Sequence, residues 1–418
     1  MESTKELRNK LPEGKSKEVV DELYMKRGGI LKAQSAGQLP RDRQQAHNIK
    51  KRLSTSGYLS APVFATNATR DVLFSVMLQC KNAEKTDRFV QEVTCAPEPM
   101  AVLCLEQQLT DLNRFCCDPH NFSVLGIDPT YCIGEFSVTP TVYRHLLLEH
   151  HKTKKSPLFL GPVLVHYRKE FRNYNFFLSP LVGLRRGLDH ILAVGTDGES
   201  ALVDAVKHQF PWCSHVRCFR HLQNNIERHL QENHFPTSAI VAYKRDIFGW
   251  TDHQEKLYHE GLVDSESGVA FERCLAVLKP IWDEREAEAF STHKSYTPKF
   301  FEWFVQYKAS DMKECTLRPL REDIGLGSPP TPYYTNDSES INAAIKEKVN
   351  YRKSEWPQFN AKMKELVDSL VQEAEKAIIG FGEFRIRDEY KHLVVPVEKW
   401  NGMTEEQRKR AIRKFHSA

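Results

Sequence analysis

One segment, HILAVGTDGESALVDAVKHQF at residues 190–210, constrains the fold more than any other. Residues 191–194 form a short apolar run that predicts a buried strand, and residues 199–210 have the apolar spacing of an amphipathic helix. Asp197 lies between them, at the carboxyl end of the strand, which is where open α/β sheets bind ligands. Asp197 therefore has two interpretations: an active-site carboxylate, or a helix cap or Asx turn.

A second segment has the same construction. Residues 124–127 form an apolar run that leads directly to Asp128, and Pro129 ends the strand. Strand-then-helix order through the middle of the chain indicates an α/β fold in which helices flank a mixed sheet. If residues 122–128 and 191–196 form neighbouring strands, the two carboxylates converge at one edge of the sheet.

A third acid lies in YTNDSESINAAIKEKVNYRK, where Asn336, Asp337 and Ser338 are good helix caps. The apolar residues that follow share one stripe of the predicted helix, and a polar stripe beside it contains Glu339, Asn342 and Lys346. Three carboxylates, Asp128, Asp197 and Glu339, would suit a pair of Mg²⁺ or Mn²⁺ ions. Two such ions bracket a phosphodiester, so the expected chemistry is in-line phosphoryl transfer on nucleic acid.

The motifs IDPTY, TDGESAL, CFRH and NDSESINAAIK, in that order, resemble the transposase domain of Mutator-like elements. That family belongs to the ribonuclease-H-like DDE transposases and integrases, and the resemblance covers about residues 120–350. It implies a ribonuclease-H-like sheet, a catalytic triad of Asp128, Asp197 and Glu339, and a large helical insertion before the last acid. It also implies DNA as the partner, both transposon ends and target, and a nuclear location.

The stretch WCSHVRCFRHLQNNIERHL contains Cys218 and His221, which match the short Cys/His signature of the family. Cys213 and His215 raise the alternative of a zinc site, but four ligands within nine positions would be cramped, so zinc is not expected. The favoured interpretation is a packed Cys218 with His221 bonded to the active-site strand end or to DNA. Arg217 and Arg220 are candidate phosphate contacts, as is Lys346.

Complete members of the family usually carry an upstream zinc-binding domain that reads DNA and often a downstream zinc finger, and this sequence has the pattern of neither. If the resemblance holds, we expect the chain to be a fragment, a partial gene model or a host-adopted derivative. Three functions stay open: a transposase core, a non-catalytic DNA-binding or assembly protein of the same fold, and a ribonuclease-H-like nuclease. A homo-oligomer is compatible with all three.

Composition excludes some classes of protein. The chain has 418 residues, enough for two or three compact units, and no apolar run approaches the roughly 18 residues that span a bilayer. The start MESTKELRNK is charged where a signal peptide would be apolar, so a cytosolic or nuclear protein without membrane contact is expected. In that setting the ten cysteines are expected to be free thiols.

The basic excess lies at the front, because the first 60 residues hold 13 Lys and Arg against 7 Asp and Glu. It peaks in residues 39–53, where the side chains that could neutralise phosphates or form an import signal are Arg41, Arg43, Lys50, Lys51 and Arg52. A solvated basic helix is the alternative.

The predicted organisation has four parts: a basic polar segment (1–60), a small unit (61–120), the transposase-like domain (121–350, with its insertion at about 222–336) and a helical tail (351–418). Within these, residues 71–80 are predicted as a strand or a buried helix, residues 99–115 as a helix, residues 157–167 as a strand and residues 173–185 as a helix.

Overall fold

A computed structural model describes residues 72–82, 88–130, 135–252, 254, 256–291 and 296–418, together with positions 6, 7, 11, 23 and 49. The chain divides into two compact units, Met1–Asp71 and Val72–Ala418. The described residues of the first unit include a small apolar cluster of Leu7, Leu11, Leu23 and Ile49. All elements discussed below belong to the second unit.

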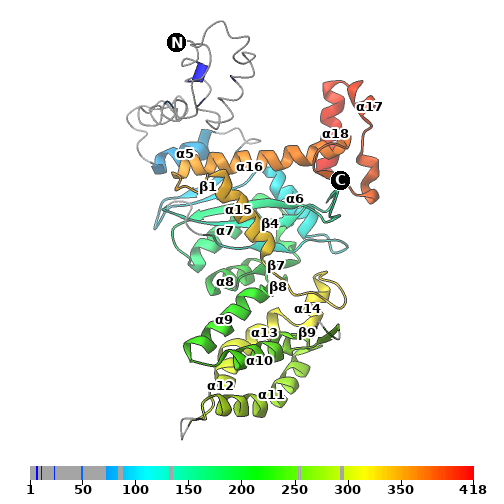
Figure 1. The fold of residues 1–418 in the computed structure, drawn as a ribbon. Helices are drawn as coiled ribbons and strands as arrows, with labels where there is room; N and C mark the ends of the chain where they lie inside the picture. The colour runs from blue at the N-terminus through cyan, green and yellow to red at the C-terminus, as the bar shows by residue number, and fades with distance from the viewer. Residues whose placement is uncertain are drawn as a thin grey trace, which may run out of the picture. The chain divides into compact units, whose positions relative to one another are not determined.

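The second unit is built on a mixed sheet of seven strands, as the strand-and-helix order predicts (Figure 1). In spatial order the strands are β1 (Val90–Thr94), β2 (Met100–Leu103), β6 (Leu158–His166), β4 (Ser137–Arg144), β3 (Leu125–Ile127), β7 (Ala193–Thr196) and β8 (Ser214–Arg217). Neighbours from β1 to β3 are antiparallel, whereas β3, β7 and β8 run parallel.

The predicted pairing of the two acid-bearing strands is confirmed. In β3 and β7, Gly126 is the registered partner of Gly195, and Ile127 is the partner of Thr196. Both strands are buried along their whole length, which explains their continuous apolar sequence, since a parallel strand covered on both faces has no polar side.

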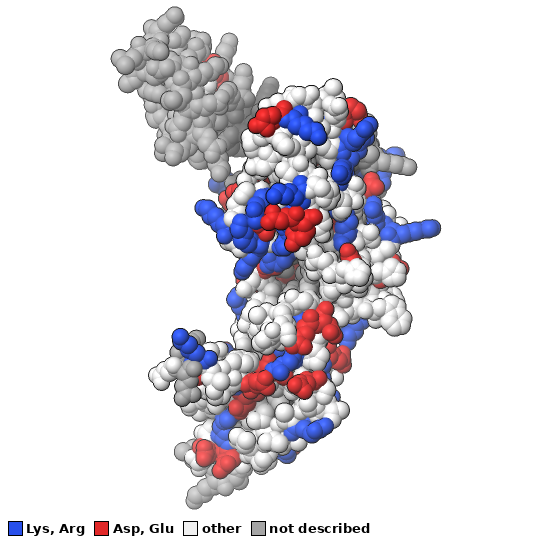
Figure 2. All heavy atoms as spheres, turned by 90° about the vertical axis from the view of Figure 1, so that its right-hand side faces the viewer, with Lys and Arg blue, Asp and Glu red and all other residues white. Residues whose placement is uncertain are grey.

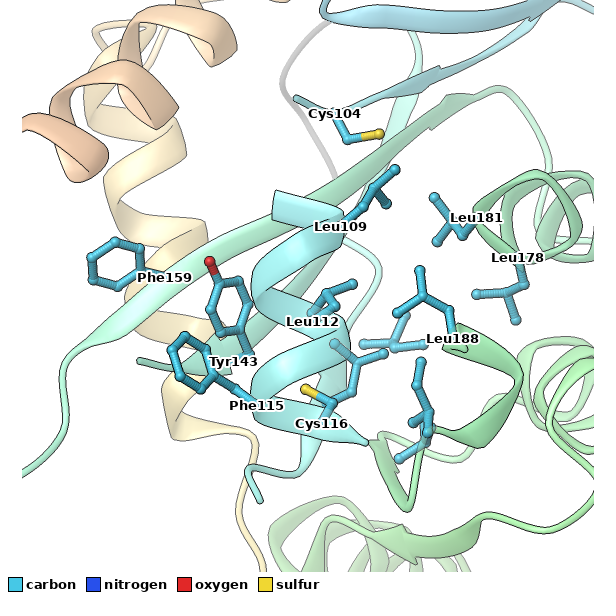
Figure 3. Packing of buried hydrophobic residues seen from close by; sticks show 14 of the residues in the cluster. Cys104, Leu109, Leu112, Phe115, Cys116, Tyr143, Phe159, Leu178, Leu181 and Leu188 are labelled. Carbon is cyan, nitrogen blue, oxygen red and sulfur yellow. The ribbon is translucent and has the colours of Figure 1, made fainter. Parts of the chain in front are cut away.

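One face of the sheet is covered by α6 (Glu106–Cys116), α7 (Phe171–Leu184) and α8 (Ser200–Gln209). Figure 3 shows Leu109 and Leu112 of α6 pointing toward Leu178 and Leu181 of α7, with Leu188 of the short helix η3 (Leu188–His190) beside them. These leucines recur every three or four residues along each helix, so each helix has one apolar side to bury.

The opposite face is covered by α5 (Val72–Asn82), α15 (Asn336–Lys348) and α16 (Trp356–Lys376). In α16 the buried side chains recur at helical spacing, namely Trp356, Phe359, Met363 and Val367. The stripe predicted for α15 is also buried, because Ile341 and Ile345 pack into the same cluster.

Between β8 and α15 the chain forms a mostly helical segment with its own core. Its elements are α9 (Phe219–Glu232), α10 (Thr237–Phe248), the hairpin β9 (Trp250–Asp252) and β10 (Leu257–His259), η4 (Leu262–Asp264), α11 (Gly268–Ala289), α12 (Phe300–Phe304), the π-helix η5 (Val305–Ala309), α13 (Ser310–Cys315) and α14 (Arg318–Asp323). Trp282 is fully buried at the centre of this core, against Phe300 and Phe304. On the face drawn in Figure 2, acidic and basic side chains lie interspersed over this lower, helical part.

The last part of the chain returns to the sheet domain through η6 (Ala377–Ile379), β11 (Phe384–Ile386), η7 (Asp388–Leu393), α17 (Val397–Asn401) and α18 (Glu405–Ser417). Strand β11 pairs antiparallel with β5 (Leu148–His150), so the predicted helical tail also contains a strand. Phe415 of α18 is fully buried and stacks on His145.

Two local predictions are resolved by the structure. Residues 99–115 are not one helix, because Met100–Leu103 pairs with β6 as strand β2 and the helix starts only at Glu106. A run of four apolar residues is compatible with a strand or a buried helix, and the neighbouring strand decides between them. Residues 71–80, left open between strand and helix, lie largely within helix α5.

None of the described helices is long and apolar enough to cross a membrane.

Candidate active site at the ends of β3 and β7

Asp128 and Asp197 leave the sheet at the same edge. Asp128 directly follows Ile127 and Asp197 directly follows Thr196, and those two residues are registered partners on neighbouring parallel strands. Asp128 is buried, with 8% of its surface exposed, while Asp197 is half-buried. The topology therefore brings together two carboxylates that are far apart in the sequence.

Glycine residues on β3 and β7 let the chain that carries Glu339 approach Asp128 and Asp197. A Cβ atom on Gly195 would lie 2.2 Å from Cζ of Tyr333, and one on Gly126 would lie 3.0 Å from Oγ of Ser338. The chain around the start of α15 thus packs directly on the two acid-bearing strands, where a larger side chain would hold it off. Ser338 is fully buried there, and Glu339 follows it.

Helix α15 contacts the acid pair through Asn342, whose Nδ2 donates to Oδ2 of Asp128 at 3.3 Å. Asn342 and Glu339 are three residues apart, so they share one face of the helix. Glu339 itself is exposed, and both of its carboxylate oxygens accept hydrogen bonds from Nη1 of Arg220 in α9, each at 3.2 Å.

The three carboxylates interact electrostatically. Burial and then the charges of Asp197 and Glu339 together raise the pKa of Asp128 from 3.8 to about 6, against the opposing effect of His221. Lys169 is a second nearby cation that lowers the pKa of Asp128. A bound cation would favour the ionised form of a carboxyl group whose pKa is raised by burial and by neighbouring carboxylates.

The acids do not form a finished ligand set in this structure. Among the described residues, no three His, Cys, Asp or Glu side chains are grouped closely enough to hold one metal ion. Two local bonds account for part of this: Glu339 is turned toward Arg220, and Oδ1 of Asp197 accepts from the backbone N–H of Glu199 at 3.0 Å. The Asx-turn interpretation of Asp197 is therefore confirmed, and it leaves a role in the site open.

The Cys/His signature lies beside the acids. Cys218 is buried immediately before α9, and its Sγ accepts hydrogen bonds from the backbone N–H and the hydroxyl of Thr335, both at 3.4 Å. Burial opposes ionisation of Cys218, but hydrogen bonds with His221 and Thr335 outweigh it and lower the pKa of the thiol to about 7. Because Thr335 immediately precedes α15, these hydrogen bonds link the start of α9 to the start of the helix that carries Glu339.

His221 completes this arrangement. Its hydrogen bond with Cys218 raises the pKa of the imidazole, burial lowers it, and the charges of Asp197 and Asp128 raise it. Of the two predicted partners of His221, the strand end interacts with it only electrostatically, through Asp197 and Asp128, while its hydrogen bond is with Cys218. A bond from His221 to DNA stays a prediction.

Cys213 and His215 have other surroundings. His215 is buried, with Nε2 at 2.8 Å from Oγ1 of Thr196 and Nδ1 at 3.4 Å from Sγ of Cys315. Burial lowers the pKa of His215 to about 4 and raises that of Cys213 to about 11. Both ring nitrogens of His215 are thus engaged away from the Cys218 and His221 pair.

The residues predicted to contact phosphates differ in how far they are exposed. Arg217 is buried, forms an ion pair with Asp311 and donates to the carbonyl of Gly198 at 3.0 Å, so its guanidinium is not presented to a phosphate. A charge pattern alone does not reveal such burial. Arg220 is exposed next to Glu339, and Lys346 is half-buried on the stripe of α15 that carries Asn342.

The basic residues predicted near the front, Arg41, Arg43, Lys50, Lys51 and Arg52, lie outside the described residues. Sequence reasoning missed the contribution of Lys169 and Glu199, which form an ion pair at 2.8 Å, and of Tyr174, whose hydroxyl donates to Glu199 at 3.1 Å. The only signal for Glu199 was its position two residues after Asp197.

No protein-family profile matches the chain, and a search of curated proteins finds no significant match.

Proposed function

We propose that the chain is the catalytic core of a DNA transposase, or of a protein derived from one, that performs metal-dependent strand cleavage and joining. The observation that carries this proposal is the registered placement of Asp128 and Asp197 at the carboxyl ends of neighbouring parallel strands. Helix α15 packs on those strands and brings Glu339 into electrostatic contact with Asp128.

The order of the strands supports a ribonuclease-H-like fold. Strands β6, β4 and β3 are antiparallel neighbours, and β7 and β8 continue the sheet beyond β3 in the parallel sense. That is the arrangement expected of this fold, with the first acid on the first strand and the second acid on the fourth. Strands β1 and β2 extend the sheet at its far edge.

The donor set suits Mg²⁺ or Mn²⁺ in its chemistry. Asp128, Asp197 and Glu339 offer hard carboxylate oxygens, and the pKa of Asp128 is raised by burial and then by the negative charges of the other two, which a cation would neutralise. Two such ions, when bound, would activate the attacking oxygen and stabilise the leaving oxygen of a phosphodiester. Glu339 could join them only after it leaves Arg220.

Other residues of the chain would orient the acids and the substrate. The bond from Asn342 to Oδ2 of Asp128 fixes the rotation of that carboxylate. Arg220 is exposed and would exchange its partner Glu339 for a phosphate of DNA, so that substrate binding frees the third acid. Cys218 is a positioning residue, because it holds Thr335 at the start of α15.

Labelled duplex DNA incubated with Mg²⁺ or Mn²⁺ tests the proposal. The protein should nick and join the labelled strand, Asp197→Asn should lose this activity, and Asp204→Asn, on the exposed side of α8, should retain it. Hydrolysis without joining, above all on an RNA–DNA hybrid, would assign the same site to a nuclease. DNA binding without cleavage, unchanged by Asp197→Asn, would instead indicate a non-catalytic protein.

A further inference from the structure

Helix α11 has an apolar side that the chain itself does not cover. Its inner side buries Phe271, Leu275 and Trp282 in the core of the helical segment. On its outer side Val277 is 66% exposed and Ile281 is 45% exposed. Within the second unit, the helix lies at the lower end in Figure 1, away from the sheet.

The exposed apolar residues follow one stripe. Val269, which is 61% exposed, is followed by exposed Ala276, Val277, Pro280 and Ile281. Ala276 lies seven residues after Val269, and Pro280 and Ile281 lie three and four residues after Val277, so all five share one side of the helix. An isolated apolar residue at a surface is ordinary, whereas a stripe along a single helix is typical of a helix-packing surface.

The charges of α11 divide into two groups. Two ion pairs bind it to neighbouring helices, Glu272 with Lys313 at 2.5 Å and Arg285 with Asp246 at 2.6 Å, and a third joins Lys279 to Asp283 within α11 at 2.9 Å. Arg273, Glu284 and Glu288 are exposed on the stripe side, and none has an ion-pair partner among the described residues. Arg273 and Glu284 flank the apolar centre, one at each end.

This pattern is complementary to itself. We propose that a second copy of this chain binds the stripe, with the two α11 helices antiparallel about a two-fold axis between residues 278 and 279. Arg273 then lies opposite the partner's Glu284, and Glu284 lies opposite the partner's Arg273. Between these pairs Val277 meets the partner's Pro280, and Ala276 meets the partner's Ile281. A two-fold interface requires this kind of self-complementarity.

The size of the surface predicts a weak dimer. A helix of 22 residues is about 33 Å long, so two such helices bury less than the roughly 1,200 Å² of a standard interface. Dissociation constants of weak contacts of this size are on the order of micromolar or above. The dimer should therefore form and dissociate with concentration. The inference does not depend on the proposed function.

Sedimentation velocity of the full chain, from about 1 to about 200 μM to bracket that affinity, tests the inference. The wild-type protein should shift from monomer to dimer. Arg273→Glu and Glu284→Arg should each weaken self-association by about tenfold or more, because like charges then face each other twice. Both positions are exposed, so circular dichroism should show an unchanged fold.

A mixture of the two single variants gives the most specific test of the proposed pairing. Arg273→Glu protein is acidic at both positions 273 and 284, and Glu284→Arg protein is basic at both, so a mixture should form a heterodimer that neither forms with itself. The double variant, with the pair reversed, should dimerise like the wild type. A wild-type monomer at every concentration, unaltered dimers in both single variants, or a mixture that stays monomeric would each overturn the inference.

Discussion

Replacing Asp128 by Asn should stabilise the fold at neutral pH. The folded state raises the pKa of Asp128 from 3.8 to about 6, mainly through burial and then through the charge of Asp197. Each pH unit corresponds to about 1.36 kcal/mol, so keeping this carboxylate ionised costs the folded protein about 3 kcal/mol at pH 7. An amide of the same shape avoids that cost and can still accept the hydrogen bond from Asn342.

The sign gives a definite pH window. Below pH 3.8 the carboxyl group is protonated in both states, so the two proteins should have similar free energies of unfolding. As the pH rises from 3.8 to about 6, the wild type loses stability relative to the variant. Above about pH 6 the difference in the free energy of unfolding is constant. Urea unfolding at a series of pH values measures this difference directly, with Asp204→Asn as the surface control.

Divalent cations extend the same test. Ions that bind Asp128 and Asp197 should stabilise the wild type by about 2.7 kcal/mol at a hundredfold excess over the dissociation constant, and so narrow its gap to the variant. A variant that is no more stable than the wild type at pH 7, a gain that is independent of pH, or an equal gain in Asp204→Asn would refute the reasoning.

Three further changes have expected outcomes. Gly195→Ala should displace the ring of Tyr333, which lowers the free energy of unfolding by about 1 to 3 kcal/mol in urea titration and lowers activity as well. The control Gly183→Ala, in open space on α7, should not destabilise the fold in the same titration. Trp282→Ala should cost about 3 to 5 kcal/mol in urea unfolding, because it leaves a cavity in the core of the helical segment. Arg220→Ala should tighten Mn²⁺ binding by up to about fivefold in calorimetry, since it frees Glu339 from an exposed ion pair worth about 0 to 1 kcal/mol.

The sequence was most informative where a short local pattern determines structure. The apolar run before Asp197 and the helical spacing after it are local features, and Pro129 marks the end of the strand before Asp128. Both strands could be predicted, because a buried strand is continuously apolar, whereas their parallel pairing is a property of the sheet that the structure supplies. Met100–Leu103 was misassigned because so short an apolar run fits either a strand or a helix.

The surroundings of the acids could not be predicted in the same way. Whether Arg217 faces solvent depends on Asp311, 94 residues away, and the bond between Arg220 and Glu339 joins two residues that are 119 positions apart. Such pairings depend on how the helical segment packs on the sheet, which residue type and spacing do not record. The close approach of Tyr333 to Gly195 likewise becomes visible only in three dimensions.

The most direct test of the central claim is where Mn²⁺ binds. Crystals of the protein grown with Mn²⁺ and DNA should show anomalous scattering beside the carboxylates of Asp128 and Asp197, at ligand distances of about 2.0 to 2.6 Å, with Glu339 turned away from Arg220 toward the ions. Asp128→Asn crystals should lose or weaken that signal. Mn²⁺ that binds elsewhere, or strand ends that stay free of metal while Glu339 keeps its bond to Arg220 in the DNA complex, would contradict the account.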